Sequence, residues 1–424
     1  MPMVQPFGLA LRAAALLAAT VFSMGSSAVA APPEAAGPGG IGPDGTAFYV
    51  PPSPLPDGEP GSVIWTRPLT GTMALPSAAR NLLVLYRSRD PAGATVPVSG
   101  TVSLPKGTPP QGGWPVIVWT HGTTGIAAVC GPSRDTASGP EHAYIEDIRS
   151  LLDQAVAKGY AIVATDYQGL GVAGFHPFFQ GVPNAQNALD MLRAGRAVAP
   201  EIGRSYGVMG HSQGGQADLF TAAIGPAYAP EFKLVGNVAM APGSHIAARL
   251  DAVRGSDTVE LALPYVLYVL GSYAHTDPSI DLSRILTPEA KAHLPDLQIG
   301  CMTAALTQGY WSKAIAKDQF LPAPDLTAFL AMGARNEPGA LALSVPTLVM
   351  QGTADQTVRP KDTDGMVRAL CASGNAVLYK AYSGQSHDGV MAAGAQDALG
   401  FLADRFAGKP AETNCTDLPR AGQP

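Results

Sequence analysis

The sequence predicts an α/β fold in which helices cover both faces of a mostly parallel central sheet. From Trp114 onward, short apolar runs that are typical of buried strands alternate with helical patterns. The chain also holds 48 Gly and 39 Pro residues, which favours many tight turns over a helical bundle. With 424 residues, 46% of them hydrophobic, it has enough apolar side chains for a substantial core.

The N-terminal residues carry the pattern of a secretory signal peptide. Arg12 precedes an apolar run from Ala13 to Phe22, and Ala28-Val29-Ala30 supplies small residues of the kind found at a cleavage site. The run is too short to span about 30 Å of hydrocarbon as a membrane anchor. We therefore exclude residues 1–30 from the fold and expect a secreted protein, extracellular or periplasmic.

Residues 31–61 are rich in Pro and Gly without apolar periodicity, so we expect an extended N-terminal arm. The first part of the α/β core is predicted over residues 62–240. It opens with three strand-like runs whose close succession predicts an antiparallel start to the sheet, at residues 62–69, 81–88 and 96–104. The alternation that follows predicts strands at residues 115–119, 160–165 and 233–240 and helices at residues 141–157 and 187–198.

Regular alternation stops over residues 241–345, which are mostly helical in pattern and interrupted by Pro. Because a structureless loop of this size is improbable, we predict an inserted helical cap, or lid. Its most apolar stretch, Leu261 to Leu270, fits either the core of the cap or the wall of an acyl pocket. The core returns over residues 346–410, and residues 411–424 form a C-terminal tail. This second part predicts strands at residues 346–350 and 376–382 and helices at residues 360–371 and 389–406.

One pentapeptide in the first part of the core carries a chemical signature. Gly210-His211-Ser212-Gln213-Gly214 lies between a short apolar segment and a helical run. A strand, a Gly-x-Ser-x-Gly sequence and a helix in that order form the nucleophile elbow of an α/β-hydrolase. The sharp turn strains the backbone of Ser212, and side chains at Gly210 and Gly214 would collide with the neighbouring strand and helix. In a chain with 48 glycines the bare pattern is expected by chance about 0.3 times per sequence, so its position has to support the interpretation.

A serine hydroxyl is a weak nucleophile at neutral pH, so it needs a general base, which in turn needs an orienting carboxylate. In α/β-hydrolases the order along the chain is Ser, acid, His, and the acid and the His follow later strands. Asp355 follows the strand predicted at residues 346–350, and His387 follows the last strand and is the only His after Asp355. We therefore predict a catalytic triad of Ser212, Asp355 and His387. Asp362 is the alternative acid.

Acyl transfer also builds negative charge on the former carbonyl oxygen, which backbone N–H groups stabilise. Gln213 at the start of the elbow helix is expected to donate one hydrogen bond. The second donor normally lies in the loop that here reads His121-Gly122-Thr123-Thr124-Gly125. We assign Thr123 as this second donor, with Thr124 as the alternative. The simpler interpretation of the segment is a Gly-rich turn without a catalytic role. His121 and His211 are expected to be structural.

The segment Asp166-Tyr167-Gln168-Gly169-Leu170-Gly171 follows a predicted strand. It therefore opens toward the carboxyl edge of the sheet, where ligands bind in α/β folds. Two interpretations stay open, a contribution to the floor of the site and a purely structural turn.

These segments together resemble the secretory lipase family of α/β-hydrolases. The similarity includes residues 81–88, 98–102, 166–171, the pentapeptide and residues 351–355, and it extends over most of the mature chain. The resemblance implies hydrolysis of carboxylic esters, often lipids, by a triad of Ser212, Asp355 and His387 beneath a helical cap.

The four cysteines gain meaning from the expected export, because disulfides persist outside the cytoplasm. They allow three connectivities, and spacing alone does not choose among them. The family resemblance implies that Cys130 pairs with Cys301 and that Cys371 pairs with Cys415.

The composition of the chain indicates which classes of partner it binds. Charged residues make up 14% of the chain and the net charge is −6, so no basic face for nucleic acid is indicated. No Cys-x-x-Cys pair or paired-His spacing indicates a metal site, and we expect no cofactor. The expected partner is a small-molecule or lipid ester, with transient contact between the cap and a lipid interface; the oligomeric state stays open.

Two other functions compete with a secreted serine ester hydrolase. The same triad serves peptidases and acyltransferases. A noncatalytic binding protein on this fold is a different class, because a fold does not fix a function. It is disfavoured because every triad position is filled.

Overall fold

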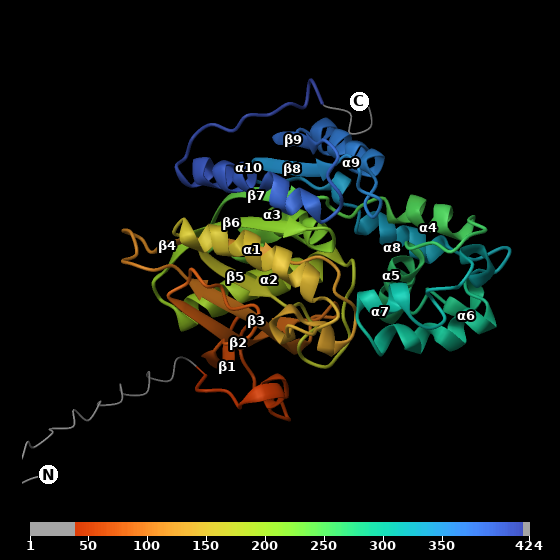
Figure 1. The fold of residues 1–424 in the computed structure, drawn as a ribbon, viewed down its shortest axis with the longest axis horizontal. Helices are drawn as coiled ribbons and strands as arrows, with labels where there is room; N and C mark the ends of the chain where they lie inside the picture. Colours follow the sequence, from red (N-terminus) through yellow and green to blue (C-terminus); the bar gives the residue numbers. More distant parts are fainter. Residues whose placement is uncertain (1–38, 419–424) are drawn as a thin grey trace, which may run out of the picture. The chain divides into compact units, whose positions relative to one another are not determined.

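The computed structural model describes residues 39–418. The predicted signal peptide, the start of the N-terminal arm and the end of the tail lie outside these described residues. Within them, one nine-stranded sheet has the strand order β1-β2-β3-β5-β4-β6-β7-β8-β9 (Figure 1). This sheet and the helices between its strands give the chain the α/β fold class that the sequence predicts.

The sheet starts antiparallel and continues parallel. The antiparallel strands are β1 (Val63–Pro68), β2 (Arg80–Arg89) and β3 (Thr95–Leu104), and β3 also runs antiparallel to its neighbour β5. The parallel strands are β5 (Ala161–Thr165), β4 (Trp114–Thr120), β6 (Ile202–His211), β7 (Lys233–Met240), β8 (Thr347–Gly352) and β9 (Val377–Tyr382). The antiparallel start at these strands is therefore confirmed.

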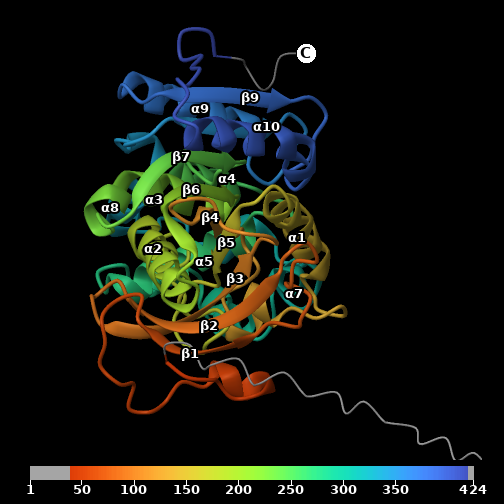
Figure 2. The same cartoon turned by 90° about the vertical axis from the view of Figure 1, so that its left-hand side faces the viewer.

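Helices cover both faces of this sheet (Figure 2). Along β4, Ile117 and Trp119 pack toward α1 (His142–Ala157) and α10 (Gly389–Phe406). The alternate residues Val116 and Val118 pack toward α2 (Gly181–Val198) on the opposite face. Helices α3 (Gln213–Tyr228) and α9 (Pro360–Ala372) meet over β7 and β8. Apolar side chains thus alternate between two buried faces, which explains the continuous apolar runs of these strands.

One helix differs clearly from its predicted bounds. The sequence pattern placed its start at residue 187, whereas α2 begins at Gly181. The early turn contains Gly181 and Pro183, which usually mark a break. Pro is tolerated in the first turn of a helix, where its missing N–H has no helical partner.

The segment over residues 241–345, called the insertion below, connects β7 to β8 and lies beside the sheet in Figure 1. Its α-helices are α4 (Ile246–Arg254), α5 (Leu263–Thr276), α6 (Pro288–His293), α7 (Met302–Thr307) and α8 (Thr327–Arg335). They surround their own hydrophobic cluster, which includes Leu267, Tyr268 and Phe329. No helix among the described residues combines the length and apolarity needed to cross a membrane.

The arrangement of parallel strands decides where a site forms. In a parallel sheet all carboxyl ends lie at one edge, so the loops after β4, β6, β7, β8 and β9 gather there. The predicted oxyanion loop, the pentapeptide, the insertion, the acid and the histidine follow these strands in turn. Residues that are far apart in the sequence therefore meet above one edge.

Candidate active site

Ser212 lies at the turn between β6 and α3 in a strained conformation, with φ of 60° and ψ of −119°. Its N–H donates a hydrogen bond of 2.9 Å to the Met240 carbonyl, and its own carbonyl accepts one of 3.0 Å from the Gly243 N–H. Such a conformation costs of order 1–3 kcal/mol and persists only when neighbours hold it. Here the end of β7 and the start of the insertion hold it.

Gly210 and Gly214 leave no room for side chains. A Cβ at Gly214 would lie 1.9 Å from the Thr120 carbonyl oxygen, and a Cβ at Gly210 would lie 2.2 Å from the Thr120 Oγ1. Thr120 is the last residue of β4. The turn can therefore approach the neighbouring strand only with glycine at both positions.

This close approach makes a stability prediction. Gly214→Ala should lower the free energy of unfolding by about 3 kcal/mol, because the new methyl group meets backbone atoms that cannot move aside. Chemical denaturation measures the change. Gly400→Ala in α10 is the matched control, since nothing lies within 4 Å of its Cβ position; it should stabilise by up to about 1 kcal/mol. Equal effects at both glycines would contradict the steric argument.

Asp355 and His387 form a hydrogen-bonded pair. The His387 Nδ1 lies 2.7 Å from the Asp355 Oδ2. The carboxylate is 1% exposed. It also accepts hydrogen bonds from the N–H groups of Thr357 and Val358 and from the Gln351 side chain, at 2.8, 2.9 and 2.9 Å. These contacts fix the carboxylate at the position from which it orients the imidazole.

The alternative acid does not contact the histidine. Asp362 lies in the first turn of α9 and lines a cavity beside Ser212, and no hydrogen bond joins it to His387 in the described chain. The geometry thus favours Asp355 over Asp362 as the partner of His387.

Ser212 and His387 line the same cavity, which has a volume of about 350 Å³. No hydrogen bond joins the two side chains among the described residues. Such bonds are often long without substrate and tighten when it binds. With Nδ1–H donated to the carboxylate, the Nε2 of His387 is the free proton acceptor.

A chain of hydrogen bonds that the sequence did not predict runs from the His387 carbonyl through His211 and Tyr144. The His387 carbonyl can only accept, so the His211 Nε2, at 3.0 Å, is the protonated nitrogen. The His211 Nδ1 then accepts from the Tyr144 hydroxyl at 2.9 Å, which in turn accepts from the Gly122 N–H at 2.8 Å. Burial and the nearby His387 hold the pKa of His211 well below its usual range, so this ring is neutral.

His211 is therefore structural, as expected, but its contact is with the backbone of His387 itself. His121 is structural as well. Its ring nitrogens lie 2.6 Å from the Gly122 carbonyl and 3.2 Å from the Asp166 carbonyl. Nothing in the sequence around Tyr144, which lies within α1, indicated its part in this chain of hydrogen bonds.

The two predicted oxyanion donors lie beside Ser212. Gln213 is the first residue of α3, where backbone N–H groups have no partner within the helix. Its side-chain Nε2 lies 3.0 Å from the His176 Nε2, and this contact fixes the side chain. Two cavities reach Ser212, the one shared with His387 and a second one lined by Asp362. Thr123 lines both of them, whereas Thr124 lines neither and is fully buried. The geometry favours Thr123 over Thr124.

The segment of residues 166–171 fits the structural interpretation. The Asp166 carboxylate accepts hydrogen bonds from the Ser99 hydroxyl at 2.6 Å and from the Ser133 N–H at 2.9 Å. None of its residues lines either cavity at Ser212. The chain that follows instead supplies Phe178 and Phe179, which line one of them and which sequence reasoning did not single out.

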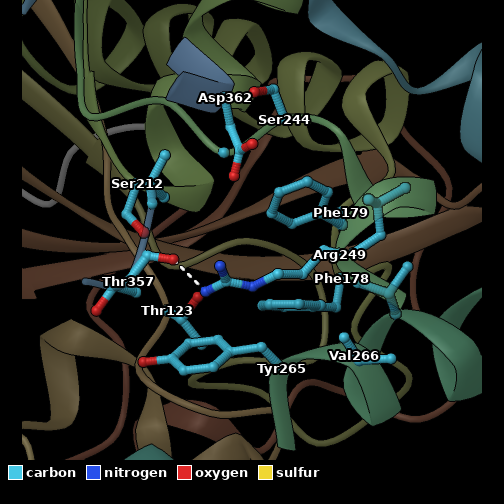
Figure 3. A pocket seen from close by; sticks show the side chains of 14 residues that line it. Thr123, Phe178, Phe179, Ser212, Ser244, Arg249, Tyr265, Val266, Thr357 and Asp362 are labelled. Carbon is cyan, nitrogen blue, oxygen red and sulfur yellow. Dashed lines mark hydrogen bonds between the residues drawn. The ribbon is translucent and has the colours of Figure 1, made fainter. Parts of the chain in front are cut away.

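Two cavities meet at Ser212. The first, called the apolar cavity, has a volume of about 60 Å³ (Figure 3). Its walls include Phe178, Phe179, Ile246, Val266 and Val269. The second, called the polar cavity, is the one of about 350 Å³ shared with His387, and its walls include Glu141, Thr303 and Asp388.

The apolar stretch over residues 261–270 contributes both to the core of the insertion and to the wall of the apolar cavity. Leu263, Leu267 and Leu270 are buried in the hydrophobic cluster of the insertion. Tyr265 and Val266, on another side of α5, line the apolar cavity.

Two disulfides join the cysteines as the family resemblance implies. Cys130–Cys301 connects the region after β4 to the start of α7, and Cys371–Cys415 connects α9 to the tail. Next to the first disulfide, the Met302 N–H donates to the Thr124 carbonyl at 3.0 Å. This disulfide therefore fixes the insertion to the predicted oxyanion loop.

One group of side chains has the composition of a metal site. His211, His387 and Asp388 place their ligand atoms within 4.8 Å of one another, and no other such group occurs among the described residues. Both ring nitrogens of His211 already take part in hydrogen bonds, and the Nδ1 of His387 is held by Asp355. We assign no metal to it.

Comparisons with known proteins give the family. Residues 145–414 match the model of a family described as secretory lipase. The chain is 25% identical to a probable inactive lipase of Mycobacterium tuberculosis, covering 87% of this chain and 83% of that protein. It is 22% identical to lipase A of Arthroderma benhamiae, with 88% and 82% covered.

A solved structure shows the same fold. The X-ray structure of Candida antarctica lipase A in its closed state superposes with a TM-score of 0.71, covering 85% of this chain and 86% of that chain, at 17% sequence identity. The α/β-hydrolase fold is therefore confirmed.

Proposed function

Because this chain belongs to the secretory lipase family and is a carboxylic ester hydrolase, we propose that its reaction runs through Ser212, Asp355 and His387. The observation that supports this most strongly is the Asp355–His387 hydrogen bond of 2.7 Å beside a strained Ser212 that faces the same cavity as His387.

The reaction proceeds by acyl transfer. The Ser212 Oγ attacks the ester carbonyl while the His387 Nε2 takes its proton. Asp355 orients the ring and stabilises the imidazolium. The N–H groups of Gln213 and Thr123 donate to the oxyanion. His387 returns the proton to the departing alkoxide, and water then releases the acid from Ser212 by the same steps.

This mechanism indicates which part of the ester each of the two cavities binds. The leaving alcohol takes its proton from His387, so it must lie on the side of Ser212 that His387 lines, which is the polar cavity. The acyl group then extends to the other side, into the apolar cavity. The volume of this cavity, about 60 Å³, is small and favours a short acyl group. We propose that the enzyme as folded here prefers esters of short acyl chains.

Covalent labelling tests the assignment of the nucleophile. A fluorophosphonate probe should label the wild-type protein and leave Ser212→Ala unlabelled, and mass spectrometry of the digest should place the label on Ser212. A label on another serine would contradict the proposal. Product analysis with competing alcohol and amine acceptors would show whether water is the main acceptor, as hydrolysis requires.

We also propose that the protein is exported. The pattern of residues 1–30 and the two disulfides both support an oxidising compartment outside the cytoplasm. Lipases of the family to which the chain belongs are described as secretory.

Exposed apolar side chains on the insertion support contact with lipid. Val259, Leu261 and Ile299 are 44%, 69% and 77% exposed. Burying one Leu side chain in a lipid surface is worth about 1.5–3 kcal/mol. Leu261→Asp should therefore lower the rate on emulsified tributyrin about tenfold while leaving the hydrolysis of dissolved p-nitrophenyl acetate unchanged.

The matched control for this prediction is Val50→Asp, because Val50 is 67% exposed and lies outside the insertion. It should affect neither substrate. Equal losses on the emulsion for both variants would contradict a specific lipid contact of the insertion.

A further inference from the structure

A third cavity lies beyond the apolar cavity. This outer cavity has a volume of about 600 Å³, and its walls include Val253, Val259, Leu261 and Ala262 from the insertion. Three residues line both it and the apolar cavity, namely Arg249, Tyr265 and Thr357. These shared residues form the boundary between a space of about 60 Å³ at Ser212 and one about ten times larger.

Arg249 closes that boundary with a single contact. It lies on α4, and its guanidinium donates a hydrogen bond to the backbone carbonyl of Thr357 (Figure 3). Thr357 belongs to the loop after β8, where its N–H holds the Asp355 carboxylate. The contact thus joins the insertion to the loop of the catalytic acid, directly beside the proposed acyl site.

The boundary is thin at this point. Within the described chain Arg249 forms no ion pair, and its hydrogen bond to Thr357 is its one side-chain bond. Tyr265, the other shared side chain, lies on α5 at the side of the apolar cavity. Of the three residues at the boundary, Arg249 is therefore the one whose long side chain is held there by a single hydrogen bond.

Building on the proposed function, we propose that Arg249 is the end wall of the acyl site and sets the upper limit of acyl chain length. With Arg249 bound to Thr357, the acyl site is limited to the apolar cavity of about 60 Å³. Without this side chain the acyl group gains access to about 600 Å³ of additional space, where apolar side chains such as Val253 and Leu261 share the walls with polar ones such as Glu260 and Arg359. Arg249 is thus a specificity-determining residue, not a catalytic one.

Arg249→Ala tests this role. The measurement is kcat/KM for p-nitrophenyl esters from acetate to laurate, expressed as the ratio of decanoate to butyrate. The ratio should rise at least tenfold, because each additional buried methylene is worth about 0.8 kcal/mol. Since any disturbance of Asp355 through Thr357 acts on all chain lengths alike, the ratio removes it. An unchanged ratio would overturn the proposal.

Blocking the outer cavity gives an independent test. Ala252 is exposed on α4 and lines only the outer cavity. Ala252→Trp should leave the wild-type ratio unchanged and should abolish the gain in the Arg249→Ala background. If Ala252→Trp alone lowers the decanoate ratio, acyl chains already pass Arg249 and the proposal fails. The comparison of Ala252→Trp alone with the wild type does not depend on the folding of Arg249→Ala.

Arg254→Ala is the control for charge on α4, because Arg254 pairs with Asp251 at 2.8 Å and lines none of the three cavities. Its profile should match the wild type; a raised decanoate ratio there would count against a specific role of Arg249. Failure of the triad proposal would look different, since Ser212→Ala would then retain activity whatever the chain-length ratio of Arg249→Ala.

Discussion

Ser212→Ala should lower kcat/KM for p-nitrophenyl butyrate by about 10⁴-fold or more while the protein stays folded. Removing the nucleophile of a triad leaves only the catalysis that oxyanion donors and substrate binding provide. The Ala side chain fits the elbow, because the strain there belongs to the backbone and the surrounding hydrogen bonds are made by backbone atoms of Ser212. Thermal unfolding and circular dichroism should match the wild type.

His387→Ala should cause a loss of similar size, and the double variant should lose no more than either single variant, because the two side chains act as a unit. Ser386→Ala is the matched control, since Ser386 adjoins His387 and its hydroxyl accepts a hydrogen bond from the Gly389 N–H at 3.1 Å. It should retain nearly full activity. Wild-type rates in Ser212→Ala would end the proposed mechanism.

The position of the candidate triad was predictable because it depends on chain order. A parallel sheet brings the ends of its strands to one edge, so a residue that follows a recognisable strand is placed even without knowledge of its contacts. Asp355 follows β8 and His387 follows β9, and the structure brings their side chains within 2.7 Å. The glycines of the elbow were predictable for a local steric reason.

Residues that act through tertiary contacts were not predictable. Tyr144 reaches His211 across 67 positions, and Arg249 reaches Thr357 across 108. Each lies within an ordinary helix, and its neighbours in the sequence carry no motif. Their partners depend on how the insertion and α1 pack against the core, which periodicity does not encode. The predicted start of α2 was wrong for a different reason. Pro183 usually marks the end of a helix, but the first turn of a helix tolerates Pro, and Pro183 lies in that turn.

Removing the disulfide Cys130–Cys301 should lower both stability and activity. The two cysteines are 171 positions apart, and closing a loop of that length constrains the unfolded chain by about 5 kcal/mol in the chain-entropy model. A Cys130→Ser/Cys301→Ser variant should therefore unfold at clearly lower denaturant concentration. The contact between Met302 and Thr124 lies beside this disulfide. We expect its removal to displace the predicted oxyanion loop, and a displacement of about 1 Å is enough to lower kcat about 10²-fold.

The second disulfide separates these two effects. Cys371–Cys415 closes a segment of 44 positions between α9 and the tail, away from both cavities at Ser212. Its removal should cost about 4 kcal/mol by the same model, yet kcat below the unfolding transition should stay within about twofold of the wild type. Rates measured well below each transition, together with denaturation curves, compare the variants. If both variants lose activity equally, the loss reflects general instability, and Cys130–Cys301 has no special part in holding the oxyanion loop.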